Sequence, residues 1–423
     1  MQSSPYTPVR IDGDRLWSRL MALAEVGAYA AHSGLQGVNR LALTDADSAG
    51  RHLVVGWMRE AGLEVRIDAM GNVFGRREGT EPSAAPVMSA SHIDSVATAG
   101  AFDGCLGVLA ALEAVETFDA LGVTTRRPID IGFFTEEEGV RFGTDMLGSA
   151  VACGRIPVEQ AHALTDADGH TLADELARTG WDGTHPAHLD PPHAYVELHI
   201  EQGPVLASEG LTLGVVTGVQ GISWQEVTIE GRSAHAGTTP TELRIDAALA
   251  AARVITHVQE LVDSGRFGGL RGTVGQLALA PGLTNVVAHR AVLTVDLRNP
   301  DDEALTAAEG ELTAYLRGLE ATQPGLMIRT RRMARTAPVP FDEGVQKVIA
   351  QAIEDLGHDY RHLISGAGHD AQEVAAIAPT AMVFVRGEHD GISHNPREWS
   401  TPEACAAGAD VLATVLHRLA MED

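Results

Sequence analysis

The sequence has few cysteines, few basic side chains and no long apolar run. Its three cysteines, Cys105, Cys153 and Cys405, lie far apart and form no CxxC pair, which argues against a disulfide framework and a zinc–thiolate site. The 31 basic against 57 acidic side chains, a formal charge of −26, exclude nucleic acid and anionic membranes as partners. No stretch reaches the roughly 18 apolar residues of a membrane-spanning helix. Residues 1–17 contain no basic-then-apolar leader, so we expect a cytoplasmic chain.

The length and the hydrophobic pattern predict an α/β protein with two domains. With 423 residues, the chain is too long to fold around a single hydrophobic core. Its 44% hydrophobic and 21% charged side chains are typical of a globular protein. Apolar runs of strand length alternate with helical ones, which predicts a doubly wound, mainly parallel sheet covered on both faces. The expected strands include 63–68, 72–75, 85–92, 129–135, 195–200 and 380–385, and the expected helices include 14–31, 48–61, 104–121 and 402–419.

The stretch from 218 to 332 has a different character. Its strand-like and helical segments follow in the order β-α-β-β-α-β, which predicts a small ferredoxin-like α+β layer inserted into the larger domain. We therefore expect the first part of a catalytic domain at 1–217, an inserted domain at 218–332 and the second part of the catalytic domain at 333–423.

His92 and Asp94 stand at the end of the strand expected at 85–92. Residues two apart on a strand point to the same face, so the Asp94 carboxylate can accept the second ring N–H of His92. Such a contact fixes the tautomer of a histidine and raises its basicity as a metal ligand. By itself, a pair of this kind also occurs in proteins without a metal.

Four carboxylates stand close to this pair in the sequence or at the end of the next strand. Asp103 precedes a predicted helix, where it either caps the helix N-terminus or bridges two cations. Glu136, Glu137 and Glu138 follow the next strand as three consecutive acids. Adjacent carboxylates repel one another unless cations or protons compensate them, or unless they belong to a solvated loop.

Two histidines occupy comparable positions further along the chain. His199 lies at the end of the strand at 195–200, and His394 follows the strand at 380–385. A lone histidine at such a position is more often a hydrogen-bonded structural residue than a metal ligand. Together with the acids, however, they lie beyond the carboxyl ends of several strands of one parallel sheet, where open α/β folds place their sites. Nitrogen and oxygen ligands without a thiolate suit Zn, Mn, Co or Ni.

The chain resembles the zinc-dependent hydantoinase/carbamoylase family within the aminoacylase-related dinuclear metallopeptidases. The matching stretches run in order from about residue 85 to 400: SHIDSV, FDGCLGVLAALE, EEGVRFGTDMLGS, ELHIEQGPVL, GVQGISW, SAHAGTTP, TNVV, DLR, GAGHDAQ and GISHNP. The family includes N-carbamoyl-L-amino-acid hydrolases and allantoate amidohydrolases. The resemblance implies that the inserted domain is a lid and that the protein is a homodimer.

The resemblance also implies two divalent metal ions, with zinc expected and Mn, Co or Ni as alternatives. Asp103 would bridge the two ions. His92 and His199 would complete the ligands of one ion, and Glu138 and His394 those of the other.

Catalytic and substrate-binding roles follow from the same resemblance. Glu137 would be the general base that deprotonates the bridging water, supported by Asp94 next to the metal ligands. His235 would stabilise the tetrahedral oxyanion, from its own chain or across a dimer interface, and Arg298 would bind a substrate carboxylate as a bidentate fork. The other residues expected to face the substrate are Gln202, Asn285 and His369. Without the resemblance, Arg298 is a surface strand residue and Asn285 a turn residue.

The leading functional prediction is hydrolysis of a small molecule with a ureido group and a carboxylate: an N-carbamoyl-L-amino acid, cleaved to the amino acid, CO2 and ammonia. Allantoate amidohydrolysis is the alternative, followed by N-acyl-amino-acid deacylase or peptidase chemistry and by a non-catalytic metal-binding protein. Some positions depart from the family's pattern, namely ATAGAF before Asp103, Cys105, Thr241 and TNVVAHR. These departures leave every metal ligand in place and concern the shape of the pocket.

Overall fold

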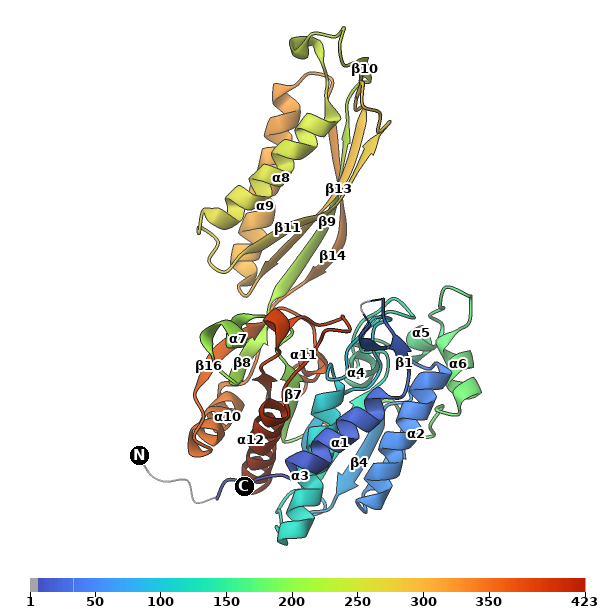
Figure 1. The fold of residues 1–423 in the computed structure, drawn as a ribbon, viewed down its shortest axis with the longest axis vertical. Helices are drawn as coiled ribbons and strands as arrows, with labels where there is room; N and C mark the ends of the chain where they lie inside the picture. The colour runs from blue at the N-terminus through green and yellow to red at the C-terminus, as the bar shows by residue number, and fades with distance from the viewer. Residues whose placement is uncertain (1–6, 33, 423) are drawn as a thin grey trace. The chain divides into compact units, whose positions relative to one another are not determined.

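The computed structural model describes residues 7–32 and 34–422; residues 1–6, which begin the segment where we expected no leader, lie outside this range. The chain divides into a larger unit within Met1–Gly218 and Pro340–Asp423 and a smaller unit, Val219–Val339 (Figure 1). Among the helices of the described part, none has the length and apolar character needed to span a bilayer.

The larger unit is built on a sheet that has nine strands within the described residues. Its four central strands run parallel, as the sequence predicts; in spatial order they are β17 (Thr380–Val385), β7 (Ala194–Ile200), β5 (Val87–His92) and β6 (Ile129–Phe134). Antiparallel strands flank them: β8 (Leu213–Val219) beside β17, and β4 (Val73–Arg77) and β3 (Glu64–Ile67) beyond β6. Two further strands, β15 (Val339–Pro340) and β16 (Tyr360–Ser365), adjoin β8.

Every residue of these four strands is buried, because helices cover both faces of the sheet at this point. One layer consists of helices that contact one another: α1 (Gly13–Ala24), α3 (Cys105–Leu121), α10 (Glu343–Asp355) and α12 (Pro402–Ala420). The short helices α4 (Leu147–Ala152) and α11 (Asp370–Val374) contact each other and the same strands. The remaining helices of this unit are α2 (Asp45–Glu60), α5 (Val158–His162), α6 (Leu172–Thr179), α7 (Val205–Glu209) and the 3-10 turn η2 (His389–Gly391).

The first predicted helix is too long, since α1 ends at Ala24 rather than near residue 31. Gly27 adopts a φ of 84°, and a Cβ at this position would lie 2.5 Å from the Asn39 carbonyl oxygen. The chain then forms β1 (Ala28–Ala30), which pairs with β2 (Gln36–Val38). A glycine turn and the short antiparallel pair that follows it therefore override the apolar periodicity.

The smaller unit has the predicted β-α-β-β-α-β order. Its antiparallel sheet consists, in spatial order, of β11 (Arg271–Ala280), β13 (Arg290–Asn299), β9 (Gly221–Glu230) and β14 (Met327–Thr336). Alternate residues of β13 are buried against α8 (Ala247–Asp263) and α9 (Asp302–Thr322), which lie on one face of the sheet (Figure 1). The short strands β10 (Ala234–His235) and β12 (Val286–Val287) pair with each other, and η1 (Thr241–Leu243) follows β10.

Candidate metal centre

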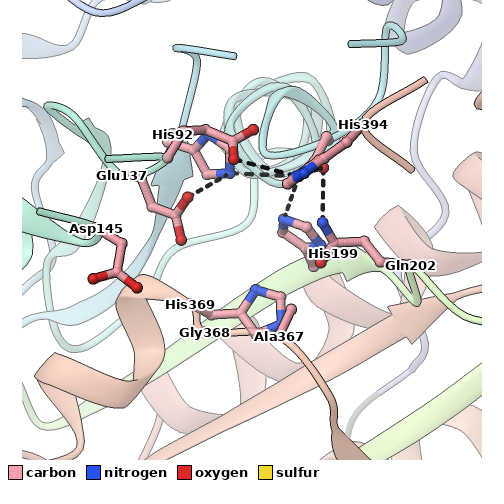
Figure 2. Close-up of a pocket in the computed structure, with 11 residues that line it drawn as sticks. His92, Glu137, Asp145, His199, Gln202, Ala367, Gly368, His369 and His394 are labelled. Atoms are coloured by element: carbon pink, nitrogen blue, oxygen red, sulfur yellow. Dashed lines mark hydrogen bonds and ion pairs between the residues drawn. The ribbon is translucent and has the colours of Figure 1, made fainter. Parts of the chain in front are cut away.

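The ends of the central strands bring ligand-type side chains to one pocket of the larger unit (Figure 2). His92 is the last residue of β5, Glu137 and Glu138 follow β6, and His199 is the penultimate residue of β7. His394 belongs to the loop after β17. Because these strands run parallel, their carboxyl ends share one edge of the sheet, and the loops that leave it converge.

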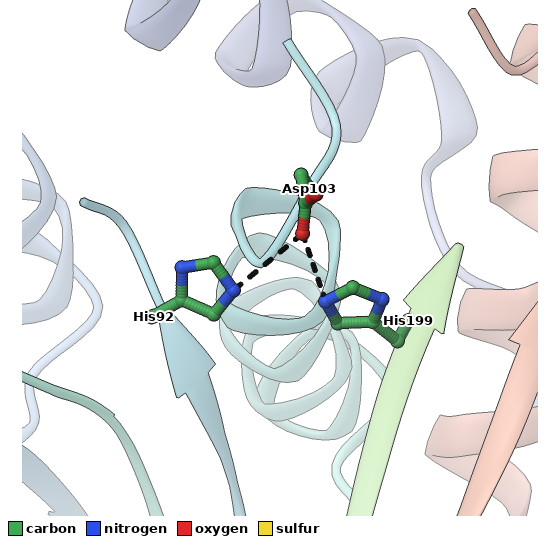
Figure 3. A group of neighbouring side chains, drawn as sticks. All are labelled: His92, Asp103 and His199. Atoms are coloured by element: carbon green, nitrogen blue, oxygen red, sulfur yellow. Dashed lines mark ion pairs between the residues drawn. The ribbon is translucent and has the colours of Figure 1, made fainter. Parts of the chain in front are cut away.

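Asp103 lies between two groups of ligand atoms. Its Oδ1 is 3.1 Å from His199 Nε2 and 3.6 Å from His92 Nε2, as Figure 3 shows. Its Oδ2 is 3.4 Å from His394 Nε2, which is 3.2 Å from Glu138 Oε2. Two sets of ligand atoms result, each within 4.8 Å, and Asp103 belongs to both.

Backbone carbonyl groups fix the ring orientation of two of the histidines. His92 Nδ1 is 3.0 Å from the Asp94 carbonyl oxygen, and His199 Nδ1 is 2.9 Å from the Ile200 carbonyl oxygen. Each Nδ1 therefore carries the proton, and each Nε2 keeps a lone pair for the pocket. The Gly104 N–H also donates to His199 Nε2 at 3.2 Å, which agrees with this tautomer.

The Asp94 carboxylate has a different partner from the one we predicted. Its Oδ1 is 4.0 Å from His92 Nδ1, so the ring N–H bonds to the main chain of Asp94 instead of to its side chain. The strand ends at His92, so Asp94 lies beyond it, and its carbonyl group is nearer to the ring than its carboxylate is. The two carboxylate oxygens lie 3.4 and 3.3 Å from the backbone nitrogens of Glu137 and Glu138, whose N–H groups point toward them.

The three consecutive acids after β6 do not form a solvated loop. Glu136 has a φ of 58° and accepts hydrogen bonds from the backbone N–H groups of Arg141 and Phe142, at 3.0 and 2.6 Å. Burial raises the pKa of Glu136 to about 8. This turn leaves Glu137 and Glu138 at the pocket and Glu136 outside it.

Burial and the close approach of carboxylates and histidines shift the pKa values of the pocket residues. Burial raises the pKa of Glu137 well above its usual range, although nearby His92, 3.5 Å from Glu137 Oε2, acts to lower it. Hydrogen bonds to Asp103 and Glu138 raise the pKa of His394 to about 10. Several carboxylates that face one another in this way require positive charge, from protons or from cations.

The residues of the pocket fit divalent cations bound by nitrogen and oxygen. Glu138 Oε1 is buried and has no hydrogen-bond partner among the described residues. A Cβ at Gly104 would lie 2.4 Å from His92 Nε2, so only glycine leaves space beside this nitrogen. Gly104 also occupies the N-cap of α3, which rules out the alternative that Asp103 caps this helix.

Two residues expected near the substrate line the same pocket. Gln202 Nε2 donates to Asp103 Oδ2 at 2.7 Å. His369 is buried, its Nε2 lies 2.8 Å from Ser365 Oγ, and its ring meets that of His199 edge-on at 4.5 Å. Burial lowers the pKa of His369 well below its usual range, so this ring is neutral.

Other residues at the pocket were not predicted from the sequence. Asp145, Ala367 and Gly368 line it, and Figure 2 shows Asp145 on the Glu137 side. Ser393 contacts Asp103, and its position beside His394 is the signal that could have identified it. The buried side chain of Cys105, a departure from the family's pattern, accepts a hydrogen bond from Arg40.

The other predicted substrate residues belong to the smaller unit. His235 Nδ1 accepts the backbone N–H groups of Gly237 and Thr238, at 3.0 and 3.2 Å, so its proton is on Nε2. Asn285 lies next to it, since its carbonyl oxygen accepts the Ala236 N–H.

Arg298 lies on β13 of the four-stranded sheet, whereas His235 belongs to the separate β10–β12 pair. Its guanidinium group is held by Asp296, with Nη2 2.9 Å from Asp296 Oδ2. The register pairs Arg298 with Ile222 at the start of β9, whereas the His235 loop follows the end of that strand. Eight residues of extended chain span about 26 Å, so the structure does not bring Arg298 and His235 together within one small unit.

Comparison with known proteins agrees with this fold and site. Peptidase family M20/M25/M40 matches residues 88–418. The chain is 44% identical to the N-carbamoyl-L-amino acid amidohydrolase of Geobacillus stearothermophilus, over 97% of this chain and 99% of that protein. It is 42% identical to the N-carbamoyl-L-amino-acid amidohydrolase of Rhizobium meliloti, over 95% of each chain. A crystal structure of a hydantoinase/carbamoylase family amidase from Burkholderia multivorans superimposes with a TM-score of 0.94, at 44% identity, covering 98% and 99% of the two chains.

The chain therefore belongs to peptidase family M20/M25/M40, a family of metal-dependent hydrolases. Within this family it is a hydantoinase/carbamoylase amidase, which confirms the resemblance seen in the sequence.

Replacing Gly104 by alanine tests the fit of a cation beside His92. We expect Gly104→Ala to lose bound metal and activity, because the added Cβ occupies the space next to His92 Nε2. Gly122→Ala is the matched control: Gly122 has the same φ of 65° at the other end of α3, and nothing lies within 4 Å of its added Cβ. Gly122→Ala carries the left-handed strain of about 1–2 kcal/mol, whereas Gly104 shares the positive φ but has a ψ of −47°, outside the left-handed helical region. Metal per chain, measured by mass spectrometry after dialysis, should fall only in Gly104→Ala; equal metal contents would contradict the assignment.

Proposed function

We propose that this chain hydrolyses N-carbamoyl-L-amino acids to the free amino acid, CO2 and ammonia, with two divalent ions as cofactors. One observation carries the proposal: each oxygen of the buried Asp103 carboxylate faces a separate set of ligand atoms, with Glu137 beside the first set. Both sets consist of nitrogen and oxygen donors, and zinc is the metal that we propose. The dispersed free cysteines support a cytoplasmic location.

We propose separate roles in the reaction for several residues at this site. When bound, paired cations polarise a carbonyl group and lower the pKa of water. Burial raises the pKa of Glu137, which makes its carboxylate a stronger proton acceptor, so that Glu137 can take a proton and pass it to the departing nitrogen. Asp94 supports the turn that carries Glu137, through the backbone N–H groups that point to its carboxylate. Gln202 and His369 line the pocket beside the residues proposed as metal ligands.

The smaller unit supplies groups that suit a substrate with a carboxylate and a carbonyl. We propose that it acts as a lid, in which Arg298 binds the carboxylate as a fork and Asn285 assists the binding of the substrate. His235 has its Nδ1 occupied by two backbone N–H groups, so its Nε2–H is available to an oxyanion.

A substrate panel tests the proposed activity. We expect the zinc-loaded enzyme to hydrolyse N-carbamoyl-L-amino acids with a higher kcat/KM than allantoate, N-acetyl amino acids or dipeptides, measured as ammonia or free amine released. Preference for allantoate would establish the alternative activity, and preference for N-acetyl amino acids or dipeptides would establish deacylase or peptidase chemistry. Inactivity on every compound of the panel would refute the proposal.

Replacing Glu137 by glutamine tests the general base. Glu137→Gln keeps the size of the side chain but removes its ability to accept a proton, so we expect kcat to fall by about 10²–10⁴-fold with bound metal retained. Glu136→Gln is the control, because Glu136 is adjacent, has a raised pKa and is turned away from the pocket. Near-normal kcat in Glu137→Gln would show that another group accepts the proton.

We also propose that the protein is a homodimer, in which the two ends of the small sheet serve different active sites. Arg298 and His235 lie too far apart within one smaller unit to contact one small substrate, because the register of β13 and β9 places Arg298 at the end of the four-stranded sheet that is remote from the His235 loop. The edge strand β11 exposes Leu277 and Leu279, and α8 beside it exposes Leu249 and Ile255. An exposed apolar edge of this kind favours pairing with a second copy.

Mixing two inactive variants tests this arrangement. His235→Ala and Arg298→Ala should each be inactive alone. After subunit exchange, half of the dimers are mixed, and one of their two sites contains both wild-type residues, so we expect about a quarter of the wild-type activity. Sedimentation should show a dimer throughout. No recovery of activity in a mixture proven to exchange would contradict the sharing of His235 between subunits.

A further inference from the structure

Glu398 holds the loop that carries Asp103, and the chemistry proposed above gives it no role. It is 5% exposed and follows His394 by four residues. Its Oε1 accepts the backbone N–H groups of Phe102 and Asp103, at 2.9 and 3.1 Å. One carboxylate oxygen on one loop therefore binds two consecutive amides of another loop, about 295 residues away in the sequence.

A second contact joins the same carboxylate to the side chain of Asp103. Ser393 Oγ lies 2.7 Å from Glu398 Oε2 and 2.7 Å from Asp103 Oδ2. The hydroxyl thus stands between the two carboxylates and contacts the Asp103 oxygen that faces His394. The hydrogen bonds to the Phe102 and Asp103 N–H groups fix the position of the Asp103 backbone. The contact with the Ser393 hydroxyl fixes the rotation of the Asp103 carboxylate.

The surroundings leave Glu398 little freedom to move. A Cβ at Gly100 would lie 2.4 Å from Glu398 Cβ, so the two loops are in close contact at this point. The ring of Trp399 packs edge-on against Phe102 at 5.5 Å, and Thr98 Oγ1 donates to the His394 carbonyl oxygen at 3.2 Å. The loop with Asp103 and the loop with His394 are therefore joined on both sides of Glu398.

We propose that Glu398 is a positioning residue for the metal centre, acting through Ser393. It locks the two loops together so that Asp103 presents one oxygen to each ligand set. The proposal rests on the proposed function in so far as that function requires cations at this centre. Partners that orient a metal ligand from outside the coordination sphere typically contribute about 10–100-fold to metal affinity.

Cobalt binding to the full-length chain tests the proposal without reference to turnover. Each variant is stripped of metal and titrated with Co2+ against a chelator, and the visible absorption of bound Co2+ is recorded. We expect Glu398→Ala to bind Co2+ about 10–100-fold more weakly and with an altered spectrum. Glu398→Gln should bind close to the wild type, because its carbonyl oxygen still accepts both amides and its NH2 group can donate to Ser393 Oγ.

Two further variants separate positioning from stability. Asp410→Ala removes a buried carboxylate that accepts the Ile11 N–H at 2.8 Å away from the pocket, so we expect a lower melting temperature with unchanged Co2+ binding. Ser393→Ala removes only the hydroxyl between the two carboxylates and tests the proposal even if Glu398→Ala does not fold. It should weaken Co2+ binding and alter the spectrum.

Three results would overturn the proposal. These are wild-type Co2+ affinity in folded Glu398→Ala, wild-type affinity in Ser393→Ala, and a Glu398→Gln variant that binds as weakly as Glu398→Ala. A wild-type enzyme that is inactive on every ureido substrate, while Glu398→Ala still loses Co2+, would refute the proposed function and leave the positioning role standing.

Discussion

Asp103 is a buried carboxylate with imidazole, amide and hydroxyl groups around both of its oxygens, and the loops of the larger unit are arranged to supply them. Burying a charged carboxylate is costly unless several partners compensate it. Here the partners come from three chain segments: the end of β5 contributes His92, the end of β7 with its following loop contributes His199 and Gln202, and the loop after β17 contributes Ser393 and His394. Only the shared edge of a parallel sheet brings so many chain segments to one point.

The smaller unit follows a different constraint, set by the length of its strands. Ten-residue strands give the sheet two distant ends, with the Arg298–Asp296 pair at one and the His235 loop at the other. Hydrogen bonds within each end already orient the functional group: Asp296 holds the guanidinium, and two backbone N–H groups set the tautomer of His235. Such a fold orients two substrate-binding side chains precisely, but it holds them too far apart to contact the same small molecule. This separation is the physical basis of the proposed dimer.

Several features were predictable because they depend on local pattern. The four central strands are mainly apolar runs, and the β-α-β-β-α-β order of the smaller unit follows from its periodicities. Apolar periodicity failed where a turn or a distant contact decides the structure. Helix α1 stops early because of a glycine turn and the pairing of β1 with β2, and the sequence did not reveal that the strand β16 adjoins β8. Glu398 carried no signal at all, since its partners are backbone N–H groups of a remote loop.

The sequence by itself determined which residue types stand at the ends of the apolar strands, and its motifs sufficed to identify the family. It did not determine how these residues face one another. The tertiary structure decided that Asp94 receives the ring N–H of His92 through its carbonyl group, that Glu136 turns away while Glu137 and Glu138 remain, and that Asp103 is shared by two ligand sets. The physical reason is that turn conformation and the pairing of distant loops, which no local pattern encodes, set the direction of each side chain.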